Sequence, residues 1–158
     1  RICSKSEKEE YDICLCALMN CDGFVNRGKV KNRGGGITMT EELVTLETAK
    51  LLKEKGFNEY CKYIINDKGL MMETIFRTSK DLPKLFYSCP IQSIAQKWLR
   101  ETKSLHIEIS YMYGNYWIYD ILTIPNHDLV GLSDRPITHY NTYEEALEAG
   151  LQEALKLI

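Results

Sequence analysis

The stretch SLHIEISYMYGNYWIYDILTI, residues 104–124, carries the clearest structural pattern in the chain. Two runs in which apolar and polar side chains alternate flank Gly114–Asn115, a dipeptide typical of a two-residue β-hairpin turn. Because successive side chains of a strand point to opposite faces of the sheet, this turn predicts which residues share a face. The predicted core face carries Leu105, Ile107, Tyr111, Tyr113, Tyr116, Ile118, Leu122 and Ile124.

The opposite face of the predicted hairpin mixes apolar, aromatic and polar side chains. We expect a candidate partner-binding surface here, because four of its residues are more apolar than a face turned to water requires. Those four residues are Met112, Trp117, Tyr119 and Ile121. The alternative is that residues 125–140 or a second copy of the chain cover them, which is the commoner arrangement for such a patch.

An amphipathic helix is predicted after the hairpin, in NTYEEALEAGLQEALKLI, residues 141–158. Thr142 can cap this helix, and Glu145 three residues later completes a capping box. A glycine inside a helix costs about 1 kcal/mol relative to alanine, so Gly150 on the inward stripe predicts a close approach of the helix to the sheet. The inward stripe comprises Tyr143, Ala146, Leu147, Gly150, Leu151, Ala154 and Ile158.

Another helix is predicted before the hairpin, in PIQSIAQKWLRETK, residues 90–103. Its apolar residues recur with the period of a buried helix face, which places Trp98 in the core. The outward face carries Gln92, Gln96, Lys97 and Arg100. This face is either a solvated surface, the commoner case for an amphipathic helix, or a contact surface.

A third helix is predicted in TEELVTLETAKLLKEKGF, residues 40–57. Thr40 can cap its start, and Gly56 fits the left-handed position that ends many helices. Phe57 would then fold back on Leu52, as in a Schellman ending. Both ends of this helix are therefore marked in the sequence.

Between the helices at 40–57 and 90–103, two short apolar runs predict a second hairpin. These runs are YCKYII, residues 60–65, and LMMETIF, residues 70–76, and Gly69 in the NDKG between them can adopt a positive φ. The following segment RTSKDLPKLFYS reads as a loop. The complete order is α-β-β-α-β-β-α, which predicts an α+β fold with an antiparallel sheet of about four strands and helices packed on one face.

The first 38 residues differ in character from the rest of the chain. The motif RGGGITMTEELV, residues 33–44, lacks the glycine spacing of a phosphate-binding loop and follows a polar segment without strand character. Consecutive glycines are also what a purine-rich ribosome-binding tract encodes in frame, and they stand just before Met39. We therefore expect residues 1–38 to be a poorly ordered extension translated from upstream sequence, and residues 39–158 to be a single α+β domain.

Composition argues against several classes of function. The formal net charge of −2 gives no basic footprint for nucleic acid, and no apolar run is long enough to cross a membrane. Because the N-terminal residues show no secretory signal pattern, we expect a cytoplasmic protein. Four of the six cysteines, Cys3, Cys14, Cys16 and Cys21, have an irregular spacing that does not match a zinc site.

Catalytic constellations are equally hard to find in the sequence. Neither Cys61 nor Cys89 lies close in sequence to any of the three histidines, and no other feature favours a Cys–His pair. His127, Asp128 and Asp134 could form a metal or acid–base cluster, with ordinary polar loop residues as the alternative interpretation. We therefore expect a protein that is not an enzyme and has no cofactor or metal.

Three helical blocks resemble the signature segments of one group of proteins. EELVTLETAKLLKEKGF, PIQSIAQKWLRE and YEEALEAGLQEALKLI are similar to segments of a family of short, uncharacterised proteins from Bacteroides-type gut bacteria and their phages or prophages. The resemblance extends over residues 39–158 and implies a start equivalent to Met39. Ile91 stands where the family pattern often has a threonine, which leaves that helix without its usual cap. The resemblance implies no activity, cofactor or catalytic residue.

These observations together favour a small non-enzymatic interaction protein of phage or mobile-element type, with an accessory or inhibitory role. It would contact a host or phage protein through the mixed sheet face or the acidic C-terminal helix, and a homodimer is a further expectation. The alternative is a nucleic-acid-associated regulator that uses the basic face of the helix at 91–103, with Lys97, Arg100 and Lys103. The net charge makes nucleic acid the less expected partner.

Overall fold

The computed structural model describes residues 41–131 and 136–158. The expectations for residues 1–38, for Met39 as the start, for Thr40 as a cap and for Asp134 lie outside this part of the chain. The described helices are α2 (Leu46–Glu54), α3 (Gln92–Lys103), α4 (Tyr143–Lys156) and the short 3-10 helix η1 (Ser79–Asp81). The described strands are β1 (Cys61–Asn66), β2 (Met71–Arg77), β3 (Phe86–Ser88), β4 (Leu105–Met112), β5 (Tyr116–Thr123) and β6 (Leu129–Val130).

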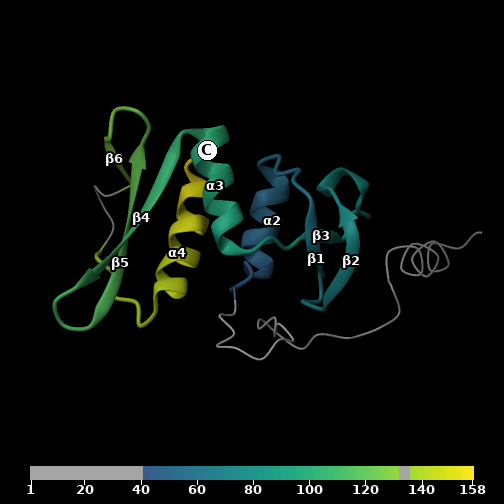
Figure 1. The fold of residues 1–158 in the computed structure, drawn as a ribbon, viewed down its shortest axis with the longest axis horizontal. Helices are drawn as coiled ribbons and strands as arrows, with labels where there is room; N and C mark the ends of the chain where they lie inside the picture. Colours follow the sequence, from purple (N-terminus) through teal and green to yellow (C-terminus); the bar gives the residue numbers. More distant parts are fainter. Residues whose placement is uncertain (1–40, 132–135) are drawn as a thin grey trace, which may run out of the picture.

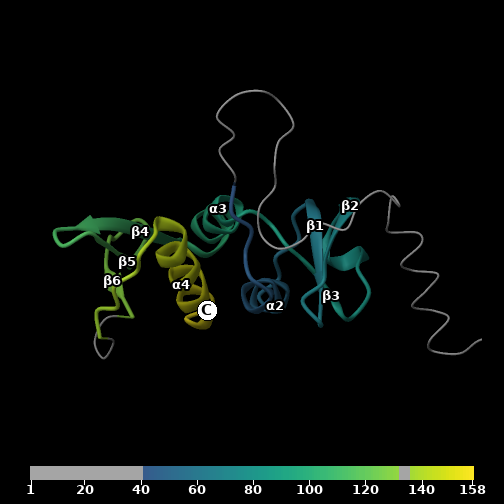
Figure 2. The same ribbon diagram turned by 90° about the horizontal axis from the view of Figure 1, so that it is seen from below.

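The α+β class and the order of the long elements agree with the sequence, but the sheet arrangement differs. The strands form two three-stranded antiparallel sheets, ordered β2-β1-β3 and β4-β5-β6, in place of one sheet of about four strands. Figures 1 and 2 show α2, α3 and α4 as a layer between these two sheets. Because the helix layer offers apolar residues on both of its sides, each hairpin buries one face against it and no pairing between the hairpins is needed.

One hydrophobic core passes through all three layers. Leu52 from α2, Leu99 from α3 and Leu151 from α4 belong to the same buried cluster as residues of both sheets. The rings of Phe57 and Trp98 meet edge to face, with centroids 5.5 Å apart. The predicted place of Trp98 in the core is therefore confirmed.

The register of the β4–β5 hairpin differs by one residue from the predicted register. Met112 pairs with Tyr116, so the turn contains three residues, and Gly114 and Asn115 in it have positive φ values of 108° and 63°. A shift of one residue moves every side chain of β5 to the other face relative to β4. The face that packs on the helices carries Leu105, Ile107, Ile109, Tyr111, Trp117, Tyr119, Ile121 and Thr123.

Helix α4 lies against this face as its glycine predicts. A Cβ atom built on Gly150 would lie 2.7 Å from Cγ2 of Ile107, so only a glycine allows the backbone this close. The hydroxyl of Thr142 accepts a hydrogen bond from the Glu145 N–H at 3.1 Å, while the Glu145 carboxylate reaches the N–H of Asn141. The predicted cap and the predicted close approach are both confirmed.

Helix α2 begins five residues later than the sequence motif suggests, at Leu46 with Thr45 as its cap. The residues before Thr45 are extended because they pair with the start of α3: Leu43 forms a bridge with Ile91, and the Val44 N–H donates to the Pro90 carbonyl at 3.0 Å. At the other end, Phe57 N–H donates to the Leu52 carbonyl and Gly56 has a φ of 89°. The Schellman ending is therefore confirmed.

The segment expected to be a plain loop, residues 77–88, contains η1 and the edge strand β3. Strand β3 pairs with β1, so that Ile65 faces Tyr87. Lys53 of α2 fixes this segment, because its ammonium group donates to the carbonyls of Pro83, Lys84 and Phe86. A strand of three residues is held here by tertiary contacts, which local sequence patterns do not reveal.

Candidate functional site

The one-residue shift in register divides the four residues that the sequence assigns to a partner-binding face. Ile121 is 1% exposed and Tyr119 is 7% exposed, and both lie on the face that packs against the helix layer. Met112 lies on the opposite face, and Trp117 is half-buried on the face of Tyr119. A partner can therefore not contact all four residues on one surface without opening the core.

The register brings together a different set of aromatic side chains, which we call the aromatic surface and define as Tyr111, Trp117 and Tyr143. The rings of Tyr111 and Trp117 have centroids 4.9 Å apart, and the rings of Trp117 and Tyr143 meet edge to face at 5.5 Å. Tyr111 is 58% exposed and Tyr143 is 39% exposed. The aromatic surface is thus a continuous row of three rings that remains open to solvent at both of its ends.

The aromatic surface exists because the hairpin extends beyond the part of α4 that covers it. Figure 1 shows the tip of the β4–β5 hairpin at the same end of the molecule as the start of α4. The buried residues of α4 begin at Ala146, whereas Tyr143 belongs to the first turn of the helix. Tyr111 and Trp117 therefore lie beside the first turn, where the helix no longer shields them completely.

Sequence reasoning missed Tyr111 and Tyr143 because it assigned both to the core. With a two-residue turn, Tyr111 falls on the buried face and Trp117 on the opposite one. A three-residue turn with a left-handed final residue is the next most common hairpin connection, and Asn115 is a residue type that tolerates that conformation. If this three-residue turn is assumed for the hairpin, the sequence predicts that Tyr111 and Trp117 lie side by side on one face.

An acidic groove lies next to the aromatic surface, between the start of α4 and the start of α2. It has a volume of about 580 Å³, and its described lining includes the carboxylate residues Glu42, Glu144, Glu145 and Glu148. Tyr140 also lines it and exchanges two backbone hydrogen bonds with Trp117, at 2.8 and 2.9 Å. The groove and the row of aromatic rings are therefore linked through Tyr140, which lines the one and pairs with a member of the other.

Glu148 is the structural member of this groove. Its Oε1 atom accepts hydrogen bonds from the Thr45 N–H, at 2.9 Å, and from the Thr48 hydroxyl. Its Oε2 atom accepts from the side-chain amide of Gln92, at 2.9 Å. Gln92 is consequently buried and does not face solvent as the helix pattern predicts. One carboxylate thus connects α2, α3 and α4, and it sits where the dipole of α2 favours a negative charge.

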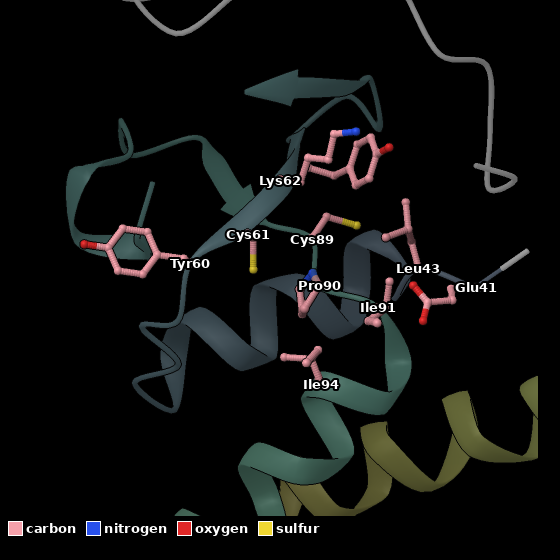
Figure 3. Close-up of a pocket in the computed structure, with 10 residues that line it drawn as sticks. Glu41, Leu43, Tyr60, Cys61, Lys62, Cys89, Pro90, Ile91 and Ile94 are labelled. Carbon is pink, nitrogen blue, oxygen red and sulfur yellow. The ribbon is translucent and has the colours of Figure 1, made fainter. Parts of the chain in front are cut away.

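A second pocket, with a volume of about 290 Å³, lies between the start of β1 and the start of α3. Figure 3 shows Cys61, Cys89, Pro90 and Ile94 around it, with the ring of Tyr60 projecting away from the cysteines. Burial raises the pKa of the Cys61 thiol to about 12. Burial and the nearby Cys61 likewise raise the pKa of the Cys89 thiol to about 12. Both thiols are therefore protonated at neutral pH, which makes them poor nucleophiles.

The basic helix face of the nucleic-acid alternative is less available than its sequence suggests. The Lys97 ammonium lies 3.8 Å from the Glu101 carboxylate. The Lys103 ammonium lies over the ring of Trp98, 5.3 Å from its centroid. Only Arg100 among the three proposed residues has no ion pair or ring contact within the described chain. Glu101 therefore offsets part of the positive charge that this face presents to phosphate groups.

Two further features bear on the classes of function expected. In residues 41–131 and 136–158, no three His, Cys, Asp or Glu side chains come close enough to hold a metal ion together. None of the helices in this same part of the chain combines the length and the apolar character needed to cross a bilayer.

Comparisons with protein-family models, with curated proteins and with solved structures gave no match to this chain. The resemblance to proteins of Bacteroides-type bacteria and phages stays a prediction.

Proposed function

We propose that this protein is a non-enzymatic interaction protein whose partner binds at the aromatic surface. The observation that carries the proposal is the row formed by Tyr111, Trp117 and Tyr143, which keeps large rings exposed beside a rigid sheet and helix. Tyr and Trp contribute large contact areas at a low cost in conformational entropy and are enriched at protein interfaces. The phage or mobile-element setting and an accessory or inhibitory role are parts of the same proposal.

Two observations support an interaction protein over the alternatives. A nucleic-acid regulator would need the cations of α3, and Lys97 and Lys103 are already engaged by Glu101 and Trp98. An enzyme acting through a thiol would need a lowered pKa, and both described cysteines have a raised one. Neither alternative is supported by a group of side chains that the fold of the described residues brings together. The fold does bring together the three rings of the aromatic surface.

The proposal is tested by comparing two tyrosine variants in partner capture. Tyr111→Ser removes a ring from the aromatic surface, and Tyr60→Ser removes a ring of similar exposure, 69%, that lines the cysteine pocket just before β1. Wild-type protein and both variants are immobilised, and proteins retained from a bacterial host extract are quantified by mass spectrometry. We expect a protein that is retained by the wild type and by Tyr60→Ser but lost with Tyr111→Ser. Equal retention by both variants would contradict the proposal.

A DNA-binding experiment distinguishes the proposed function from the second candidate, a nucleic-acid-associated regulator. Binding of duplex DNA is followed by fluorescence anisotropy at low and at moderate salt, with Arg100→Ala as the variant. We expect no salt-dependent binding. A strong, salt-sensitive interaction that Arg100→Ala weakens would favour the nucleic-acid regulator instead.

A further inference from the structure

We infer that the partner of the aromatic surface presents a basic, arginine-bearing segment that runs from the aromatic rings into the acidic groove. The inference rests on the proposed function and names the chemistry of its partner. Its basis is the direct continuity of the two features: Tyr140 lines the groove and pairs with Trp117, and Tyr143 is followed in the chain by Glu144 and Glu145. A ligand segment that extends from Trp117 and Tyr143 past Tyr140 therefore enters the groove that the carboxylates line.

The charge of the groove is one-sided. Its described lining contains four glutamates and no Lys or Arg. Glu148 is already used by hydrogen bonds to α2 and α3, and Glu145 accepts from the Asn141 N–H. Within the described parts of the chain, the carboxylates of Glu42 and Glu144 form neither an ion pair nor a hydrogen bond. These two carboxylates are the ones available to an incoming cation.

Arginine fits this combination better than lysine. A guanidinium group can stack on an aromatic face and still donate hydrogen bonds to a carboxylate, because its donors lie in one plane. The exposed ring of Tyr143 offers the face, and Glu144, the next residue in the first turn of α4, offers the carboxylate. A lysine ammonium is a more strongly hydrated point charge and gains less from the same surface.

A second copy of this chain is a poorer occupant. A twofold interface places the same patch on both partners, so an interface centred here would set Glu42, Glu144 and Glu145 against their own equivalents. Like charges brought together cost binding energy and therefore select against such a pair. The surface is complementary to a basic partner and not to itself.

The inference is tested with short synthetic peptides as probes. A labelled nonapeptide that alternates glycine and arginine is titrated with wild-type protein and followed by fluorescence anisotropy, beside glycine–lysine and glycine–glutamate versions. We expect binding of the arginine peptide, weaker binding of the lysine peptide and no binding of the glutamate peptide, with an affinity that falls as salt is raised. Equal binding of the arginine and lysine peptides would overturn the arginine preference.

Two double variants that remove negative charge show where the arginine peptide binds. The double variant Glu42→Gln/Glu144→Gln removes the two available carboxylates, and Glu54→Gln/Glu59→Gln makes the same change in net charge at exposed positions that do not line the groove. We expect the first to weaken the arginine peptide about tenfold, from two exposed charge contacts, and the second to leave its affinity unchanged. Equal effects of the two double variants would overturn the inference.

The failures of the two proposals are distinguishable. If the captured partner depends on Tyr111 but the arginine peptide does not bind, the surface recognises another chemistry, and the inference is wrong while the proposed function stands. If the peptide binds with equal affinity to wild type and to Tyr111→Ser, its site is not the aromatic surface, which also overturns the inference. If no partner depends on Tyr111, the proposed function itself fails.

Discussion

Glu148 connects three helices through one carboxylate. Its oxygens accept hydrogen bonds from the backbone of Thr45, the hydroxyl of Thr48 and the amide of Gln92. Thr48 is fully buried, so the loss of this acceptor leaves its hydroxyl, among the described residues, with only the longer contact to the Thr45 hydroxyl, at 3.3 Å. The hydrogen bonds to this one carboxylate therefore hold α2, α3 and α4 in their relative positions.

We predict that Glu148→Ala lowers the free energy of unfolding by about 1–2 kcal/mol, because Thr48 and Gln92 lose a charged acceptor and keep, within the described chain, only the Thr45 hydroxyl and the Glu144 carbonyl as partners. Glu153→Ala, on the same helix and without a side-chain hydrogen bond among the described residues, serves as the control and should change it by less than about 0.5 kcal/mol. Urea denaturation followed by circular dichroism measures both. Equal losses in the two variants would mean that the Glu148 network contributes nothing specific.

The raised pKa values of Cys61 and Cys89 predict a loss of stability at alkaline pH. Below the ordinary thiol pKa of 9.0, both thiols are protonated in the folded and in the unfolded chain. Above it, the unfolded chain releases protons that the folded protein keeps until about 12, so the free energy of unfolding falls as the pH rises. Each thiol contributes at most about 1.4 kcal/mol per pH unit in this window.

The measurement compares wild type with Cys61→Ala/Cys89→Ala at about pH 8 and at about pH 10.5, by urea denaturation. We expect a steeper loss of stability in the wild type, because only the wild type carries the two buried thiols. Since other groups titrate in the same range, only the difference between the two proteins tests the prediction. Parallel curves would show that burial does not hold these thiols protonated.

Among the elements, the β4–β5 hairpin forms most of the second sheet, and α4 packs against one face of it. Sequence patterns located both elements and the cap of α4, because each of these depends on residues near one another in the chain, and a glycine on the buried stripe of α4 indicated the close approach to the sheet. They did not locate the register, because a two-residue and a three-residue turn fit the same Gly114–Asn115 dipeptide. The candidate site changed with the register, since one residue of shift exchanges the faces of β5.

Substitution of Gly150 tests the packing of α4 on the sheet. We predict that Gly150→Leu lowers the free energy of unfolding by more than about 2 kcal/mol, because even a Cβ atom would lie 2.7 Å from the buried Ile107 side chain. Glu153→Leu adds the same side chain at a partly exposed position of α4 and should be tolerated. An unchanged melting temperature for Gly150→Leu would contradict the close approach.

At the scale of the whole molecule, the aromatic surface lies beside the acidic groove, while the cysteine pocket shares only Leu43 with the described lining of that groove. The cysteine pocket lies between β1 and α3, whereas the acidic groove lies between α4 and α2. The sequence predicted the α+β class but not the separation into two sheets, because β3 and β6 are too short to show a strand pattern. Long-range packing alone decides which hairpin faces which helix.

We propose above that the open end of this three-layer fold, with Tyr111, Trp117 and Tyr143, is a protein-binding surface. The most direct measurement is the dissociation constant of the captured partner for wild type, Tyr111→Ser and Tyr60→Ser, determined by isothermal titration calorimetry. The structure predicts a loss of at least about tenfold in affinity for Tyr111→Ser, as for truncation of an interface aromatic residue, and no change for Tyr60→Ser. An unchanged dissociation constant for Tyr111→Ser, or an equal loss for Tyr60→Ser, would contradict the claim.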